Sequence, residues 1–129
     1  MATTYATKRI LILLTGGTIA GNVAASNVSQ NVKSDSSNFS SVVNSCIEIV
    51  KRNWAIEIEP TIVELFNVDS SDILPSNWTI LVSKIEETYD EYDAFIVLHG
   101  TNTMCYTCAA LSFALENINK KVIINGAQV

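Results

Sequence analysis

Two short turns place threonine hydroxyls and glycines directly after apolar segments of the chain. The first turn is TGGTIAG (15–21), which follows the apolar run 10–14, and the second is HGTNTM (99–104), which follows residues 95–98. A threonine hydroxyl becomes a nucleophile when a neighbouring base accepts its proton. Glycine allows the backbone to approach a ligand closely. Thr18 is therefore a candidate nucleophile, and the hydroxyls of both turns are expected to converge on one small substrate.

The first turn lacks residues that two known nucleotide-binding motifs require. Gly16 and Gly21 have the spacing of a phosphate-binding P-loop, but Asn22 and Val23 replace the lysine and the serine or threonine that it requires. A dinucleotide fingerprint is excluded because Thr18 occupies the position of its second glycine. The alternative left open is a tight strand-to-loop turn, in which the glycines only permit unusual backbone dihedrals.

The general base that Thr18 would need is not evident. His99 is the only histidine, and its place at the end of an apolar run before a glycine favours a structural role. No Ser-His-Asp constellation can be assembled around it. A carboxylate or a lysine would have to accept the proton.

A third polar turn, DSSD (69–72), also follows an extended apolar segment. As part of a site, Asp69, Ser70 and Ser71 would offer hydroxyls and backbone N–H groups to an anion. The alternative is a helix N-cap cluster ahead of Pro75. The spacing leaves both interpretations open.

The cysteines predict neither a disulfide framework nor a metal centre. Cys105 and Cys108 have the spacing of a redox motif, but they fall inside a predicted helix, which favours two small buried side chains. A zinc site lacks a second ligand pair. Cys46 makes the count odd, and an odd count without a framework indicates a reducing, cytoplasmic compartment.

Composition narrows the class of protein. The chain has 129 residues, of which 48% are hydrophobic, enough for one domain with a core. Its net charge of −5 disfavours nucleic acid as a partner, since phosphate binding requires clustered lysine and arginine. The apolar run 10–14 is shorter than a secretory core of about 7–15 residues or a membrane span of about 20. We therefore expect neither a secretory signal nor a membrane-spanning segment.

Hydrophobic periodicity predicts alternating strands and helices. Residues 1–7 are expected to be a loose leader and residues 21–37 a loop. Strands are predicted at 8–14, 54–59, 62–66 (separated from the previous one by Pro60), 94–98 and 121–125, and helices at 39–52, 75–89 and 103–117. This order predicts an α/β fold with a doubly wound, mostly parallel, flavodoxin-like sheet.

The helices are each predicted to bury one face. The first is expected to bury Phe39, Val42, Val43, Cys46, Ile47 and Val50, and the second Trp78, Leu81, Val82 and Ile85. The third is expected to bury Tyr106, Ala109, Ala110, Phe113 and Ala114.

Taken together, the motifs resemble one enzyme family. TGGTIAG, DSSD, HGTNTM and VIINGAQV (122–129) occur in the order found in bacterial-type L-asparaginases, and the chain from Asp69 onward is similar to the cytoplasmic type I enzymes. The resemblance implies an amidohydrolase that converts L-asparagine, and in some members glutamine, to the acid and ammonia, without a metal or cofactor. It also implies a homo-oligomer in the full-length family.

The resemblance assigns roles to residues of this chain. Thr18 matches the threonine that forms a covalent acyl-enzyme, and Thr101 matches a second threonine that pairs with an aspartate and a distant lysine. Asp69, Ser70 and Ser71 match the segment that holds the α-carboxylate and α-amine of the substrate. Backbone N–H groups near the glycine turns would stabilise the oxyanion.

The departures from the family predict impaired catalysis. Asn102 replaces the family's aspartate, and the loss of its charge should weaken substrate binding by about a factor of ten or more. No tyrosine occurs within 21–88 to match the catalytic tyrosine. Residues 8–129 are expected to be an incomplete amino-terminal domain without the catalytic lysine or the carboxyl-terminal domain, and therefore to show little or no turnover. The alternatives are a non-catalytic relative that binds an amino acid or a protein partner and, from fold analogy alone, a nucleotide binder.

Overall fold

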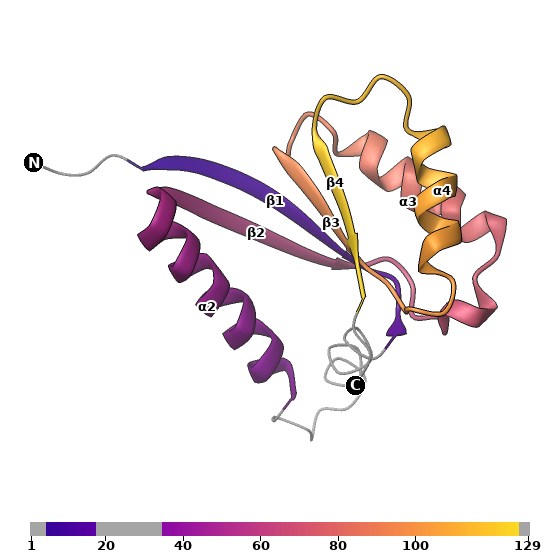
Figure 1. Cartoon of the computed structure of the whole chain (residues 1–129), viewed down its shortest axis with the longest axis horizontal. Helices are drawn as coiled ribbons and strands as arrows, with labels where there is room; N and C mark the ends of the chain where they lie inside the picture. The colour runs from indigo at the N-terminus through magenta and orange to yellow at the C-terminus, as the bar shows by residue number, and fades with distance from the viewer. Residues whose placement is uncertain (1–4, 18–34, 127–129) are drawn as a thin grey trace, which may run out of the picture.

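The computed structural model describes residues 5–17 and 35–126, and for residues 35–40 it describes the backbone alone. Within these residues the strands β1 (Ala6–Leu14), β2 (Ile56–Glu64), β3 (Ala94–Leu98) and β4 (Lys121–Asn125) form one sheet in the order β2-β1-β3-β4 (Figure 1). Every neighbouring pair is parallel. The helices are α2 (Asp35–Trp54), α3 (Pro75–Glu87) and α4 (Met104–Ala114), and a short 3-10 helix, η1, spans Ser70–Asp72. The predicted α/β fold with a parallel sheet is confirmed.

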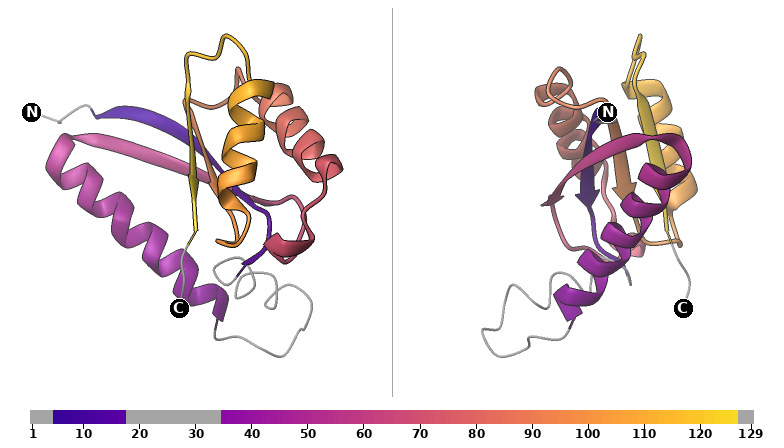
Figure 2. Two further views of the ribbon diagram at one scale, coloured as in Figure 1. Left: turned by 45° about the vertical axis from the view of Figure 1, so that its right-hand side comes forward. Right: turned by 90° about the vertical axis from the view of Figure 1, so that its left-hand side faces the viewer.

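Successive side chains of a strand point to opposite faces of the sheet, and residues are buried on both faces. From β1, Leu11 and Leu13 point to the face covered by α3 and α4, where the core contains Leu81, Ile85, Phe95, Val97, Leu111 and Leu115. Ile12 and Leu14 point to the opposite face, where Leu98 and the α2 residue Val43 pack against them. Figure 2 shows the same arrangement, with α3 and α4 side by side and α2 apart from them.

Helix α3 starts at the residue that the sequence predicts. Pro75 is at its first position, where a missing N–H breaks no helical hydrogen bond. The side chain of Asn77 accepts a hydrogen bond of 2.9 Å from the backbone N–H of Leu74, which fixes the entry of the chain into the helix. Leu81 and Ile85 are buried and Trp78 and Val82 half-buried, as predicted for this face.

Several predicted boundaries differ from the structure. Trp54, where a strand is predicted to begin, is the last residue of α2, and β2 ends at Glu64 rather than at residue 66. Helices α3 and α4 end at Glu87 and Ala114, before the predicted ends at residues 89 and 117.

Pro60 does not divide two strands: β2 runs through it, and Pro60 pairs with Ile10. The strand tolerates proline because β2 lies at the edge of the sheet. Ala6 and Thr7, expected in the leader, belong to β1. Of the predicted loop, residues 21–34 lie outside the described residues, and residues 35–37 form the start of α2.

The predicted buried face of α4 is wrong. Tyr106 and Phe113 are 64% and 82% exposed, while Thr107, Leu111 and the following Leu115 are buried. Ala109 and Ala114 are also exposed, and Ala110 is half-buried. The helix carries no charged residue, so hydrophobicity alone leaves its rotation undetermined. In the orientation that the helix adopts, the buried hydroxyl of Thr107 makes the hydrogen bonds described below.

The same rotation corrects the prediction for the cysteines, because Cys105 and Cys108 are exposed rather than buried. On α2 the prediction is partly wrong. Val43, Ile47 and Val50 are half-buried as expected, but Val42 and Cys46 are exposed. The side chain of Phe39 lies outside the described residues. Among the described helices, none has the length and apolar character required to cross a bilayer.

Candidate functional site

The candidate site lies where the strand order reverses, between β1 and β3. Strand β1 has β2 as its neighbour along one edge and β3 as its neighbour along the other, so the chain moves first in one direction across the sheet and then in the opposite direction. In open α/β sheets ligands bind beside the carboxyl ends of the strands at such a point. The turns that follow β1 and β3 are the two turns that the sequence singles out, residues 15–21 and 99–104.

Thr15 ties the end of β1 to the end of β3. Its backbone N–H and its hydroxyl both donate to the carbonyl oxygen of Leu98, at 3.1 and 3.0 Å. The side chain is 1% exposed, so it is a structural residue of the turn and its hydroxyl is not presented to a ligand. The backbone of residues 16 and 17 is thereby fixed beside the turn that follows β3.

Glycines allow three turns to meet backbone against backbone. A Cβ atom on Gly17, where φ is +81°, would lie 2.8 Å from the Cα of Gly100. A Cβ on Gly100 would lie 2.7 Å from the hydroxyl oxygen of Ser70. Gly16, with φ +116°, packs still more closely against the backbone of Val68. Larger residues at these positions would force the turns apart.

Hydrogen bonds join residues 70 and 71 to residues 102 and 103. The backbone N–H of Asn102 donates to the Ser70 hydroxyl at 3.2 Å, and the Asn102 side-chain amide donates to the Ser71 hydroxyl at 2.9 Å. The Thr103 hydroxyl donates to the backbone carbonyl of Ser70 at 2.5 Å. Four candidates, Ser70, Ser71, Asn102 and the adjoining Thr101, are therefore brought to one place.

Asp69 supplies a fixed negative charge beside this junction. Its carboxylate accepts a hydrogen bond of 2.8 Å from the backbone N–H of Ser71 and caps η1. That hydrogen bond, with a smaller contribution from the Ser71 side chain, lowers the pKa of Asp69 below its ordinary value. The alternative of an N-cap cluster for the helix at Pro75 is therefore wrong: Asp69 caps η1, and the N-cap of α3 is Leu74. Asp69 remains exposed to a ligand.

His99 has a structural environment. The ring is 4% exposed, with Nδ1 2.6 Å from the carbonyl oxygen of Gly100 and Nε2 2.8 Å from the hydroxyl of Thr107. The indole N–H of Trp78 donates to the same hydroxyl at 2.9 Å. A carbonyl only accepts, so Nδ1 carries a proton, and in the neutral ring Nε2 then accepts from the Thr107 hydroxyl. With both ring nitrogens engaged, His99 holds the turn in place.

Sequence reasoning missed the contributions of Thr107 and Trp78. Both lie on helices, and hydrophobic spacing gives no reason to connect them to His99. One usable signal is a threonine within the apolar helix that follows the histidine, because a buried hydroxyl requires a hydrogen-bond partner.

The remaining candidates are placed as follows. Thr101 is half-buried, and its Cγ2 lies 3.1 Å from where a Cβ on Gly126, after β4, would be. Thr18 lies outside the described residues, directly after Gly17 in the sequence. In the part of the chain that the structure describes, no three histidine, cysteine or carboxylate side chains are grouped so as to hold a metal ion.

Comparisons with known proteins agree with the motif resemblance. A family model described as "Asparaginase, N-terminal" matches residues 9–129. L-asparaginase 1 of Escherichia coli (strain K12) is 52% identical over 62 residues, which are 48% of this chain and 18% of that protein. L-asparaginase of Thermococcus kodakarensis is 30% identical over 121 residues, which are 94% of this chain and 34% of that protein.

A solved structure extends the likeness to the fold. L-asparaginase I from Vibrio cholerae superposes with a TM-score of 0.69 at 37% identity, covering 96% of this chain and 34% of that one. The matched segments thus span between 18% and 34% of the length of these three relatives.

Proposed function

The chain belongs to the asparaginase family, and from this premise we propose that it carries substrate-binding and nucleophile-bearing turns of an L-asparagine amidohydrolase. The reaction converts the side-chain amide of asparagine and water to aspartate and ammonia. One observation carries the proposal: at the switch point of the sheet Asn102, which occupies the position of the family's aspartate, donates hydrogen bonds to the motif residues Ser70 and Ser71. Glutamine is the second substrate that the resemblance allows.

In the proposed mechanism Thr18 is the nucleophile. Its Oγ attacks the amide carbonyl as a base accepts its proton, and the base returns that proton to the leaving nitrogen as the tetrahedral intermediate collapses to an ester and releases ammonia. Water then hydrolyses the ester. The assignment rests on the motif match and on the contact between Gly17 and Gly100. Gly17 directly precedes Thr18 in the sequence, and this contact places Gly17 beside the turn of residues 99–104. Backbone N–H groups of these turns would stabilise the oxyanion.

The hydrogen-bond directions indicate how the amino-acid part of the substrate would be held. Ser70 and Ser71 each accept a hydrogen bond from Asn102. Ser70 is 3% exposed, so its hydroxyl, like that of Thr15, holds the turns together. Ser71 is exposed, and its hydroxyl, which helps to lower the pKa of Asp69, would turn to donate to the α-carboxylate of a bound substrate. Asp69, whose pKa is lowered, is ionised at neutral pH and would pair with the α-ammonium. Hydrogen bonds to charged groups are worth about 1.5–3 kcal/mol each, so this arrangement favours a zwitterion.

Asn102 is expected to weaken this site. Its amide carbonyl still accepts a hydrogen bond from the α-ammonium, but it contributes no charge. The Asn102→Asp variant should bind asparagine about tenfold more tightly, because it replaces a neutral acceptor by a charged one. Calorimetric titration with L-asparagine and L-aspartate measures this. Asn44→Asp makes the same chemical change on the exposed surface of α2 and should leave the affinity unchanged.

Equal affinity of the original chain and Asn102→Asp would contradict the assignment of residue 102 to the substrate. Absence of heat with both ligands, at millimolar concentration and for every variant, would contradict the binding site itself. Ammonia release is the second readout: we propose that the original chain turns over slowly, and that activity rises with Asn102→Asp when a carboxyl-terminal asparaginase domain is supplied.

A non-catalytic relative that binds an amino acid or a protein partner is the second candidate. The loss of the carboxylate at residue 102 favours it, because this change reduces charge in the site and preserves the hydrogen bond to Ser71. If Asn102→Asp binds asparagine tightly and still releases no ammonia with the added domain, this second candidate is supported.

Two properties of the whole protein are also proposed. Cytoplasmic localisation is supported by Cys46, Cys105 and Cys108, which are free and exposed, as is usual in a reducing compartment. Homo-oligomeric assembly rests on the family resemblance. The net charge of −5 argues against nucleic acid as a partner.

A further inference from the structure

Helix α4 carries two exposed thiols that the proposed reaction does not use. Cys105 and Cys108 are both free and exposed. They are exposed because the helix buries Thr107, Leu111 and Leu115 instead. Their spacing of three residues places them on neighbouring turns of one side of the helix. The result is a pair of thiols on a regular helix rather than a single surface cysteine.

The backbone around the pair is that of an ordinary first helical turn. The N–H groups of Tyr106 and Thr107 donate to the carbonyl oxygen of Thr103 at 3.0 and 3.2 Å. Thr103 is in turn held by its hydrogen bond to Ser70, and Thr107 by its contact with His99. The positions of the two cysteine Cα atoms are therefore fixed from both sides.

This geometry is compatible with a bridging metal ion between the two sulfur atoms. Residues three apart on a helix have Cβ atoms about 5–6 Å apart, which is wider than the roughly 3.5–4.5 Å of a relaxed disulfide. A metal ion with metal–sulfur bonds of about 2.3 Å separates two sulfur atoms by up to about 4.6 Å, which the intact helix accommodates.

We propose that Cys105 and Cys108 form a two-thiolate site for a soft monovalent d¹⁰ cation, with copper(I) as the biological ion. Thiolates select soft ions of this kind, and copper(I) accepts two ligands in a linear arrangement. Binding releases two protons: two thiols and one Cu⁺ give a bis-thiolate complex of charge −1 and two H⁺. No oxidant or reductant takes part.

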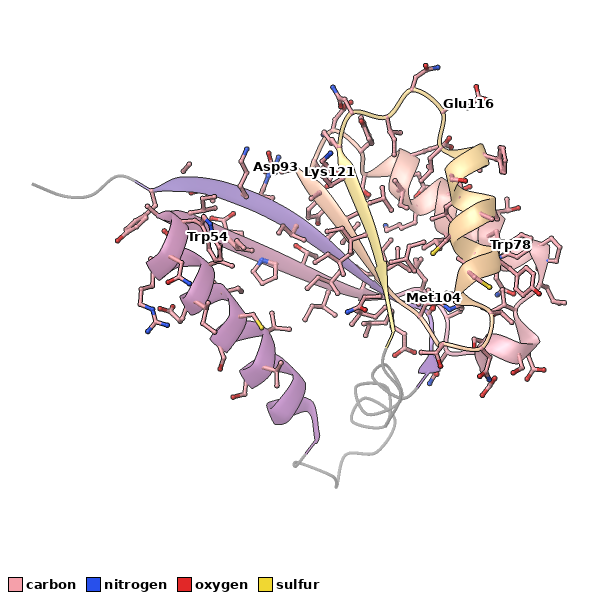
Figure 3. The ribbon with its side chains drawn as sticks, in the orientation of Figure 1. Trp54, Trp78, Asp93, Met104, Glu116 and Lys121 are labelled. Atoms are coloured by element: carbon pink, nitrogen blue, oxygen red, sulfur yellow. The ribbon has the colours of Figure 1, made fainter. Side chains whose placement is uncertain are left out.

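The position in the helix favours that product. Cys105 is the second residue of α4, where the unpaired N–H groups give the helix end a partial positive charge. An anionic complex is stabilised there, and α4 contains no charged side chain that would oppose it. Met104 is not part of the site. Its sulfur lies against Gly126 where the first turn of α4 meets the end of β4 (Figure 3).

Copper(I) itself is the probe for the test. The reduced chain is titrated without oxygen against bicinchoninate, a coloured copper(I) chelator. The original chain should withdraw one copper(I) per molecule and remain monomeric in gel filtration of the loaded form. Cys105→Ser and Cys108→Ser should each weaken binding at least 100-fold. The matched control is Cys46→Ser, which removes a lone exposed thiol on α2 and should change neither stoichiometry nor affinity.

Several results would overturn the site. Equal weakening by Cys46→Ser would mean that any exposed thiol binds the ion, and dimerisation at half a copper per chain would mean that the thiols belong to different molecules. Unchanged binding by the Cys105→Ser/Cys108→Ser double variant would also refute it. Because all three residues are exposed, the serine variants should unfold at the same urea concentration as the original chain, which separates loss of the site from loss of the fold. This test is independent of the proposed amidohydrolase function.

Discussion

Replacing Thr107 by valine removes one hydroxyl and, with it, two hydrogen bonds in the core. The Thr107 hydroxyl donates to Nε2 of His99 and accepts from the indole N–H of Trp78. Valine has nearly the same shape, so the change opens no cavity. The variant therefore isolates the effect of the hydroxyl on the turn that follows β3.

The expected loss of stability follows from what remains unpaired. His99 is 4% exposed, so its ring nitrogen stays away from water, at a cost of about 1–3 kcal/mol. Trp78 is half-buried and retains partial access to water, which limits its contribution to about 1 kcal/mol. Thr107→Val should thus lower the free energy of unfolding by about 2–4 kcal/mol. Thr107→Ser keeps the hydroxyl and loses one methyl group, which is worth about 1 kcal/mol.

Urea denaturation followed by tryptophan fluorescence measures both variants. Nitrogen-15 NMR of the imidazole provides a second readout, with the proton on Nδ1 in the original chain and in Thr107→Ser. A valine variant as stable as the serine variant would refute the assigned hydrogen bonds. So would an original chain whose His99 carries its proton on Nε2.

The remaining predictions concern the glycine contact, the rotation of α4 and the response to acid. Gly17→Ala should lose more than about 1 kcal/mol of stability in urea, because φ is +81° and Gly100 blocks the added carbon; an unchanged midpoint would contradict this contact. Phe113→Ala should change stability by less than about 0.5 kcal/mol and Leu111→Ala should cost about 2–5 kcal/mol. A larger loss of stability in urea for Phe113→Ala than for Leu111→Ala would show that the face of α4 carrying Phe113 is the buried one. Hydrogen bonds from the backbone N–H of Arg9 and from Lys8 lower the pKa of Asp93 below 3.8, so its stabilisation is complete above that value and is lost as the pH falls through the folded-state pKa. Asp93→Asn should therefore lose less stability on acidification than the original chain, and parallel pH profiles of the unfolding midpoint would show that the carboxylate contributes nothing.

The order of elements could be predicted from the sequence because local signals agree there. The strands at 94–98 and 121–125 have the predicted bounds, since each is a short apolar run between polar turns. Convergence of the turns at 69–71 and 99–103 follows from the parallel order, because all carboxyl ends of such strands meet at one edge.

The rotation of α4 could not be predicted in the same way. Both sides of the helix are apolar, and the aromatic side chains gave the larger apparent gain from burial. The structure instead buries Thr107, whose hydroxyl is satisfied by residues on β3's turn and on α3. Thr107 is 8 positions from His99 and 29 positions from Trp78, and hydrophobic periodicity does not reveal contacts at such separations. Pro60 was misjudged for a related reason, since only the sheet order shows that β2 is an edge strand.

The central claim is that residues 69–71 and 101–103 together hold the amino-acid part of asparagine. Titration of the nitrogen-15-labelled chain with L-asparagine, followed by backbone amide NMR, tests this most directly. The signals of Ser70, Ser71 and Asn102 should shift together with one dissociation constant, and propionamide, which lacks the α-carboxylate and α-ammonium, should shift none of them. Shifts confined to other elements, or equal shifts with propionamide, would contradict the claim.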